Sequence, residues 1–295
     1  MNHNFSKSSK ITLSRSSRKL KRSRRRFFIF WAVILAALIG WAGGGAYLIN
    51  QVPKNLEVNF LAVGQGDASL IKTPSRQVIL IDGGPDNSVL TGLGKDLPFY
   101  RRRIDVVVVS HYHDDHVAGL IEILKRYRVK KVIYPAGSPT SEISELFLST
   151  ATHFRIPIIY LSGSAQLDLG ENCVMNLLNP AELGVKANDN NSLVAHLDCR
   201  QTKFLFTGDN NSKVEQAIID SGQDWRADIL KASHHGSITA NSVKFLAYVQ
   251  PKLMVISVGL DNRFGHPNPV ILERAIELGI NVKRTDQDGE ARIVD

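Results

Sequence analysis

The sequence predicts an α/β protein, a four-layer αββα sandwich preceded by one N-terminal transmembrane helix. Early strand-like runs follow one another through short turns, whereas later runs alternate with helical patterns. This mixture is typical of two sheets packed face to face with helices outside them. A long uncharged stretch near the start, residues 27–49, predicts the membrane helix. The chain thus divides into a tail, a helix and one large domain.

The first segment, residues 1–26, is expected to be a basic cytoplasmic tail. It carries ten of the 36 Lys and Arg residues of the chain and none of the 28 acidic residues. The formal net charge of +8 therefore belongs to the tail, and the remainder has 26 basic and 28 acidic residues. A positive nucleic-acid-binding face over the whole body is not supported. Two local runs, Arg101–Arg103 and Lys130–Lys131, are candidates for a DNA-binding groove.

The second segment, residues 27–49, predicts a transmembrane helix. As a helix it would span roughly 34 Å, enough to cross a hydrocarbon core about 30 Å thick. Trp31, Trp41 and Tyr47 lie toward its ends, where aromatic rings favour the membrane interface. Basic residues before such a span stay in the cytoplasm. The sequence therefore predicts a single-pass cell-membrane protein with a cytoplasmic N-terminus and residues 50–295 outside the cytoplasm.

Two alternative interpretations of the uncharged stretch stand beside this one. Gly43–Ala46 offers small residues for cleavage of a signal peptide. Ser23–Phe27 resembles a twin-arginine export signal. All three interpretations place the rest of the chain outside the cytoplasm, and the length of the stretch disfavours a buried core helix.

The third segment, residues 50–295, is expected to form one domain, because it shows no linker, repeat or low-complexity run. Apolar runs predict strands at 57–62, 68–72, 78–81, 105–109, 131–134, 158–160, 174–178, 192–198, 203–206, 229–231, 253–257, 281–284 and 291–294. Helical periodicity predicts helices at 117–127, 142–152, 212–220, 242–248 and 269–278.

The two cysteines, Cys173 and Cys199, both fall in strand-like runs and lack metal-type spacing. An oxidising compartment would permit a disulfide between them, but the sequence does not show that they meet. The sequence favours two unpaired, buried thiols.

The strongest indication of a functional site is the run His111-Tyr112-His113-Asp114-Asp115-His116. Its ionisable side chains would repel or compete for protons unless a divalent cation organised them. His111 and His113 lie two apart on extended backbone, so both point to one side. Asp115 and His116 lie at a helix start, where backbone amides favour a carboxylate. Two ligand clusters from one loop favour a dinuclear site.

Other ionisable residues follow predicted strands. Asp82, Asp209, the pair His234–His235 and His266 each come after an apolar run and beside glycine. Because buried strands do not hold free charge at low cost, charged residues at successive strand ends indicate one shared polar edge.

With these motifs in place, the sequence resembles the metallo-β-lactamase superfamily, and more narrowly the hydrolase domain of ComEC-type competence proteins. The matching stretches cover essentially the whole domain: FLAVGQGDASLI (60–71), VILIDGG (78–84), VVVSHYHDDHVAGL (107–120), NNSLVAHL (190–197), FLFTGD (204–209), LKASHHGS (230–237), FGHPNP (264–269) and RTDQDGEARI (284–293). The resemblance implies the αββα fold and two divalent metal ions, Zn²⁺ or Mn²⁺.

The resemblance also implies residue roles. His111 and His113 would bind the first ion, Asp115 and His116 the second, and Asp209 both. The last ligand would be one of His234 and His235. Asp115, His116 and Asp209 are the expected catalytic residues. Asp82 would orient the loop from beneath, Gln65, Asp67 and Ser237 would line the rim, and His266 would either touch substrate or cap the following helix.

One ligand of the superfamily pattern is missing. The middle histidine is replaced by Asn188-Asp189-Asn190-Asn191-Ser192, and His196 lies too far into its strand to serve. His196 is expected to be an ordinary packed histidine. Asp189 or Asn191 could complete the shell, and an oxygen ligand would shift preference from Zn²⁺ toward Mn²⁺.

The sequence therefore predicts a metal-dependent hydrolase, a phosphodiesterase or nuclease acting on DNA at the extracytoplasmic membrane face through a hydroxide activated by two ions. The multi-helix channel of ComEC-type proteins is absent from these 295 residues, so a separate DNA-uptake channel is the expected partner. One alternative is an extracellular phosphodiesterase or esterase for cell-envelope or phosphocholine-like substrates. Another is a membrane-anchored metal-binding scaffold. The missing histidine disfavours β-lactam hydrolysis, and no oligomeric state is predicted.

Overall fold

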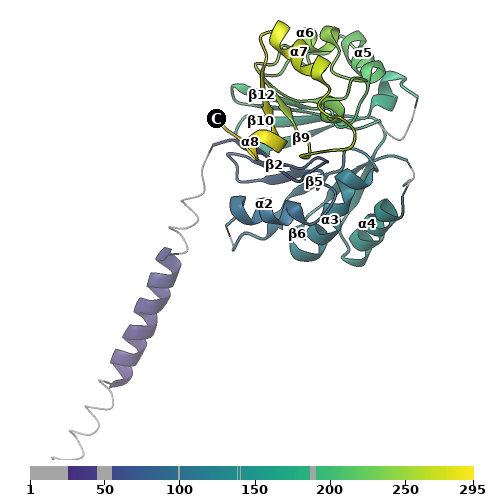
Figure 1. The fold of residues 1–295 in the computed structure, drawn as a ribbon. Helices are drawn as coiled ribbons and strands as arrows, with labels where there is room; N and C mark the ends of the chain where they lie inside the picture. Colours follow the sequence, from purple (N-terminus) through teal and green to yellow (C-terminus); the bar gives the residue numbers. More distant parts are fainter. Residues whose placement is uncertain (1–25, 45–54, 99, 138, 140, 187–190) are drawn as a thin grey trace, which may run out of the picture. The chain divides into compact units, whose positions relative to one another are not determined.

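The structure, a computed structural model, describes residues 26–44, 55–98, 100–137, 139, 141–186 and 191–295 (Figure 1). The chain divides into two units, 1–53 and 54–295. In the first unit, Arg26–Gly44 is a helix and, among the described residues, the one helix long and apolar enough to cross a membrane. The basic tail before residue 26 and the end of the predicted span, 45–49, lie outside the described residues.

The second unit contains two seven-stranded sheets. The first has the order β16-β1-β2-β3-β5-β7-β8 and is built from β1 (Glu57–Phe60), β2 (Ser69–Lys72), β3 (Val78–Ile81), β5 (Val106–Val108), β7 (Val132–Pro135), β8 (Ile158–Leu161) and β16 (Ala291–Val294). The second has the order β15-β14-β13-β12-β11-β10-β9 and is built from β9 (Ser164–Gly170), β10 (Cys173–Leu178), β11 (Val194–Cys199), β12 (Thr202–Phe206), β13 (Ile229–Lys231), β14 (Leu253–Ile256) and β15 (Asn281–Arg284). A short parallel pair joins β4 (Arg103–Ile104) and β6 (Arg128–Val129).

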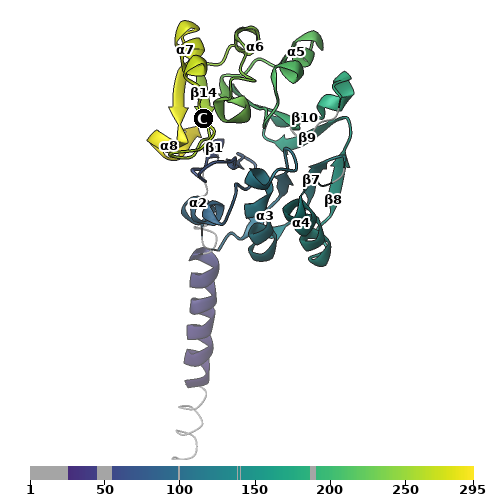
Figure 2. The same cartoon turned by 45° about the vertical axis from the view of Figure 1, so that its right-hand side comes forward.

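Helices cover the outer face of each sheet (Figures 1 and 2). The first sheet carries α2 (Ser88–Asp96), α3 (Asp114–Arg126) and α4 (Glu142–His153). The second carries α5 (Ser212–Asp220), α6 (Val243–Val249) and α7 (Pro269–Glu277). Short helical segments complete the unit: η1 (Pro180–Leu183), η2 (Ser233–Gly236) and α8 (Thr285–Asp288). The predicted αββα sandwich is confirmed.

Strand alternation explains the layers. In β3, Ile79 and Ile81 belong to the core between the sheets, whereas Val78 and Leu80 belong to the core beneath the helices. Successive side chains of a strand point to opposite faces, so a fully apolar strand supplies both cores. Phe60 and Phe206 stack across the central core with ring centroids 5.7 Å apart. The central sheets are therefore buried on both faces.

Besides the elements of two to four residues, one helix and one strand lie outside the sequence prediction. Helix α2 was not predicted, because its short sequence contains Gly92 and Gly94 and buries few side chains, among them Val89 and Leu93. Strand β9 alternates half-buried and exposed residues and has no apolar run. In addition, α3 begins at Asp114, three residues before the predicted start, because Asp114 and Asp115 form its first turn.

The expectation of two unpaired thiols is wrong: Cys173 and Cys199 form a disulfide. They lie directly opposite each other on the antiparallel neighbours β10 and β11. Whether two cysteines 26 residues apart meet depends on the register between β10 and β11. This register cannot be read from the sequence of either strand.

Two glycines bring α3 against the turn after β3. A Cβ atom on Gly119 would lie 2.0 Å from the carbonyl oxygen of Gly83, so only glycine fits. The amide of Gly83 donates to the carbonyl of His116 at 2.8 Å, and the amide of Gly119 donates to that of Gly84 at 3.0 Å. These backbone contacts fix the first turn of α3 beside Asp82.

Candidate metal centre

Ligand-type side chains gather where the first turn of α3 meets the ends of β12 and β13. The ligand atoms of one group, Asp115, His116, Asp209 and His235, all lie within 4.8 Å of one another. A second group with the same property is His111, His113 and Asp209. Three segments far apart in sequence thus supply one cluster, and Asp209 belongs to both groups.

Asp209 faces a different pair of imidazoles with each oxygen. Its Oδ1 lies 3.4 Å from His116 Nε2 and 3.6 Å from His235 Nε2. Its Oδ2 lies 3.8 Å from His111 Nε2 and 3.7 Å from His234 Nε2. A carboxylate placed in this way can serve two cations, one on each oxygen.

The outer nitrogens of two imidazoles are held from behind. Asp82 Oδ2 lies 2.9 Å from His116 Nδ1, and the amide of Ser110 donates to Asp82 Oδ1 at 2.7 Å. His235 Nδ1 lies 2.9 Å from the carbonyl oxygen of Ser257. A partner on Nδ1 orients the ring and leaves Nε2 facing the cluster, the arrangement typical of metal-binding histidines.

A buried lysine, Lys231, lies beneath the cluster and was missed by the sequence analysis. Its ammonium group forms an ion pair with Asp67, which is also buried. Asp67 Oδ1 lies 3.4 Å from His235 Nδ1, and its Oδ2 lies 3.8 Å from His116 Nδ1. The signal was a lysine at the end of the apolar strand 229–231, where an unpaired charge would be costly.

Charges within the cluster balance one another. Burial lowers the pKa of His111 well below its ordinary value, and His116 lowers it further. Burial also opposes charge on His235, but the carboxylates of Asp209 and Asp67 outweigh it and raise the pKa of His235 to about 9. Against burial, Asp209 likewise raises the pKa of His116 well above its usual range. Protons on imidazoles therefore balance the buried carboxylates, a role that a bound cation would take over.

The donor atoms fit a divalent cation. Several buried atoms of the cluster have no hydrogen-bond partner within the described ranges: His111 Nε2, His116 Nε2, His235 Nε2 and Asp209 Oδ1. Buried polar atoms are normally paired, so unpaired atoms that converge on one another indicate a missing partner. Imidazole nitrogens mixed with carboxylate oxygens suit Zn²⁺ and Mn²⁺.

Backbone strain accompanies the histidine pair. His234 and His235 both adopt left-handed conformations, with φ of 49° and 53°. The amide of His234 donates to the carbonyl of Gly208 at 2.9 Å, which ties this turn to the residue before Asp209. Non-glycine residues in this region cost about 1–3 kcal/mol each and cluster at functional sites.

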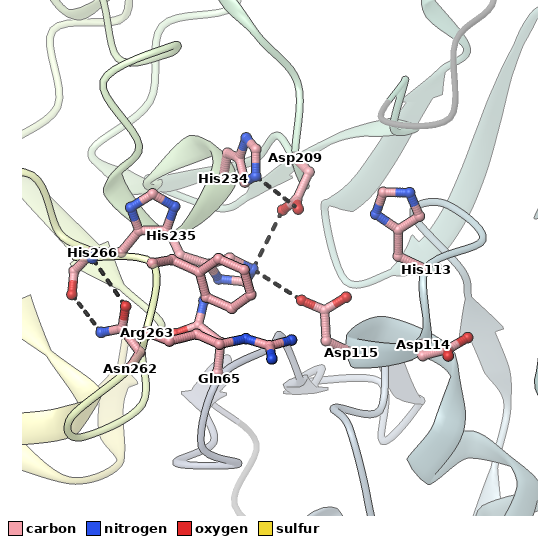
Figure 3. Close-up of a pocket in the computed structure, with 11 residues that line it drawn as sticks. Gln65, His113, Asp114, Asp115, Asp209, His234, His235, Asn262, Arg263 and His266 are labelled. Atoms are coloured by element: carbon pink, nitrogen blue, oxygen red, sulfur yellow. Dashed lines mark hydrogen bonds and ion pairs between the residues drawn. The ribbon is translucent and has the colours of Figure 1, made fainter.

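A pocket of about 580 Å³ opens over the cluster (Figure 3). Its lining residues are Gln65, His113, Asp114, Asp115, Asp209, His234, His235, Asn262, Arg263, Phe264 and His266. In Figure 3, Gln65, Asn262, Arg263 and His266 lie on one side and face Asp115 across the pocket. The cluster is therefore open to a substrate.

Of the remaining predicted residues, two line the pocket and one does not. Gln65 and His266 line the pocket, as expected. Ser237 is buried beside Thr239, its Oγ 3.0 Å from Thr239 Oγ1, and is not among the lining residues. Helix α7 is capped by Asn268, so the alternative that His266 caps it is wrong.

The segment that replaces the missing histidine is described in part. Residues 187–190, with Asp189, lie outside the described residues. Asn191 donates through Nδ2 to the carbonyl of Lys186 at 2.8 Å, and its Oδ1 is buried without a hydrogen-bond partner among the described residues. His196 contacts the carbonyl of Arg226 at 3.0 Å and packs against Trp225, so the prediction of a packed histidine is confirmed.

The predicted basic runs lie elsewhere. Arg103 and Lys130 both form ion pairs with Asp105, at 2.8 and 2.7 Å, outside the pocket lining. Arg263 and Phe264 line the pocket instead. The sequence analysis assigned neither residue a role, although Phe264 is the first residue of the quoted motif FGHPNP and Arg263 directly precedes it.

Comparisons with known proteins agree with this geometry. A family model described as the metallo-beta-lactamase superfamily matches residues 61–259. The chain is 28% identical to ComE operon protein 3 of Bacillus subtilis over 79% of its own length, and 29% identical to competence protein ComA of Neisseria gonorrhoeae over 88%. It spans about a third of the length of these relatives, 32% and 34%.

A solved structure shares the fold. The metallo-beta-lactamase fold protein YhfI from Bacillus subtilis superposes with a TM-score of 0.56 at 13% identity. The match covers 81% of this chain and 100% of YhfI. At this identity the likeness concerns the fold alone.

Proposed function

Because this chain belongs to the metallo-β-lactamase superfamily, we propose that it is a membrane-anchored, metal-dependent phosphodiesterase that cleaves DNA outside the cytoplasm. The observation that carries the proposal is the placement of Asp209, whose two oxygens face two separate sets of imidazoles. A carboxylate shared in this way is what a pair of cations acting on one phosphoryl group requires.

The proposed ligands follow the two clusters. His111, His113 and Asp209 would hold the first ion, and Asp115, His116, Asp209 and His235 the second. Between the two consecutive histidines, His235 is the better ligand, because its Nε2 is buried and its Nδ1 contacts the Ser257 carbonyl. The first ion has fewer protein ligands, which favours Mn²⁺ or Zn²⁺ with water in the open positions.

Two bound divalent ions would supply a water acidic enough to react at neutral pH and positive charge for the phosphoryl oxygens. Residues of the chain would orient the water, the ligands and the leaving group. Asp115 borders the pocket with a third of its side chain exposed, where its carboxylate can orient the attacking water. Asp82 keeps His116 in one orientation, and His266 faces the pocket from the opposite side, within reach of a leaving group.

The choice of DNA rests on the relatives named for competence and on the pocket. The matched part of this chain corresponds to 32% and 34% of the length of these relatives, and a DNA-uptake channel is the proposed partner. The apolar helix 26–44 supports a membrane anchor. The disulfide between Cys173 and Cys199 supports a domain outside the cytoplasm, because disulfides persist in oxidising compartments.

The full-length chain in detergent, given labelled single- and double-stranded DNA with Mn²⁺ or Zn²⁺, tests the proposal. We expect cleavage that EDTA abolishes and that Asp209→Asn reduces at least 100-fold, as loss of a group acting on both ions would do. Metal binding without DNA cleavage would overturn the nuclease. Phosphocholine esters and envelope polymers would then be assayed, and inertness toward all of them would leave a metal-binding scaffold.

A further inference from the structure

The pocket carries a feature that the metal ligands do not use. We propose that Arg263 and Phe264 form a nucleotide-binding rim, in which Arg263 binds a phosphate next to the scissile one and Phe264 stacks on an unpaired base. The inference rests on the proposed phosphodiesterase and specifies its substrate as single-stranded nucleic acid.

Arg263 holds an uncommitted positive charge. Its side chain is exposed at the pocket, and no carboxylate lies within 4.0 Å of it among the residues that the structure describes. Some arginines of the domain are paired, for example Arg226 with Asp224 and Arg284 with Asp286, and others are not; among the described arginines, Arg263 is the one that lines the pocket. A guanidinium without a protein partner beside a phosphate-cleaving centre suits a phosphate ligand.

Phe264 offers a partly exposed aromatic ring. The side chain is 56% exposed at the pocket mouth. The Arg263 guanidinium lies 5.2 Å from its ring centroid, and the His266 ring lies nearly parallel to it at 6.0 Å. Stacking of a base on such a ring contributes about 1–3 kcal/mol and does not depend on base identity.

The loop that carries both residues is held in shape. Asn262 donates through Nδ2 to the carbonyls of Gly259 and His266, and its Oδ1 accepts from the His266 amide at 2.9 Å. The Gly259 amide donates to Gln65 Oε1 at 3.2 Å, which ties the loop to the turn after β1. A loop ordered before binding loses little conformational entropy when a ligand arrives.

The same pair argues against a choline-type substrate. The positive charge of Arg263, 5.2 Å from the Phe264 ring centroid, would repel a quaternary ammonium group placed on that ring. A neutral base with a phosphate on either side meets both residues favourably. Bases of a duplex are stacked on one another and do not present a free face, so a single strand is preferred.

The test uses full-length wild type, Phe264→Leu and Arg263→Gln. Leu260→Ala is the matched control, since Leu260 is 74% exposed near the same loop but outside the pocket lining. Binding is measured by fluorescence anisotropy with a single-stranded oligonucleotide, its abasic counterpart of equal length and the duplex. Cleavage of the same three substrates gives KM and kcat.

We expect Phe264→Leu to weaken binding of the single strand about 5–150-fold, to raise KM more than it lowers kcat, and to leave the abasic strand unaffected. Arg263→Gln should weaken both strands and reduce the slope of log affinity against log salt by about 0.7. Leu260→Ala should match wild type.

The proposed nucleotide-binding rim would be wrong if the wild type bound base-containing and abasic strands equally. It would also be wrong if both variants kept the wild-type affinity. Loss of cleavage alone bears on the proposed phosphodiesterase, because the anisotropy measurement does not require turnover. The two failures are therefore distinguishable.

Discussion

At the residue scale, the two nitrogens of the His116 and His235 imidazoles have different roles. Asp82 and the Ser257 carbonyl hold the Nδ1 atoms of His116 and His235, and the Nε2 atoms of both rings face Asp209. Because the outer contacts set the ring orientation, the inner atoms are in place before any ion arrives.

His235→Ala should lose about one metal ion per chain, because His235 completes the group with Asp115, His116 and Asp209. His234→Ala should retain that ion, since His234 lies on the other oxygen of Asp209 and is outside the group. Elemental analysis after loading with Mn²⁺ or Zn²⁺ gives the count. Equal losses in both variants would contradict this assignment.

Lys231→Met should destabilise the fold by about 3–5 kcal/mol, because it removes the lysine counter-charge from the buried carboxylate of Asp67. Chemical denaturation of the metal-free protein provides the measurement. Adding Asp67→Asn should restore part of the loss, because the double variant buries no unpaired charge. A double variant no more stable than Lys231→Met would show that the lysine acts through packing alone.

At the element scale, long-range contacts decide what short elements do. Helix α2 ends at Asp96, which accepts a hydrogen bond from Asn59 of β1 and shares one with Glu290, just before β16. Partial burial and the Asp96 carboxyl raise the pKa of Glu290 from 4.5 to about 7. The raised pKa therefore favours a proton on Glu290 beside the Asp96 carboxyl.

Glu290→Gln should raise the Tm at pH 8 by roughly 1–3 °C and change it little at pH 4. Between pH 4.5 and about 7, folded Glu290 keeps a proton that the unfolded chain releases. The free energy of unfolding therefore falls as pH rises through this window. Thermal melts across the pH range measure the effect, with Glu273→Gln, exposed on α7, as control. A stabilisation equal at both pH values would exclude this proton on Glu290.

At the scale of the whole molecule, the disulfide bears on the proposed location of the domain outside the cytoplasm. A thiol pair in the cytoplasm is kept reduced, whereas one outside can close. The bond joins β10 and β11 in the second sheet, away from the pocket-lining residues.

The full chain in its native membrane should therefore resist maleimide labelling after denaturation and become labelled at two thiols after reduction. The same domain retained in a reducing cytoplasm should label without reduction. A gel-shift assay of quenched cells distinguishes these states. Free thiols in the native cell would contradict an extracytoplasmic domain.

Sequence reasoning predicted the sandwich, thirteen of the fourteen strands of the two seven-stranded sheets and the loop 111–116, because these depend on local pattern. The choice between His234 and His235 depends on a pair of left-handed residues that no local pattern reveals. Lys231 and the cysteine pair depend on which strands lie opposite each other. A role for Arg263 could not be predicted, because it depends on the pocket that the folded chain forms beside this residue.

The close approach of Gly119 to Gly83 has a consequence for the recognition of inactive relatives. A methyl group at residue 119 would act as a wedge, lifting the first turn of α3 and moving Asp115 and His116 away from Asp209. Such a chain would keep every ligand in its sequence and still fail to assemble the centre. The presence of all the ligand histidines and aspartates is therefore an incomplete criterion of activity. A glycine at position 119 should be required as well.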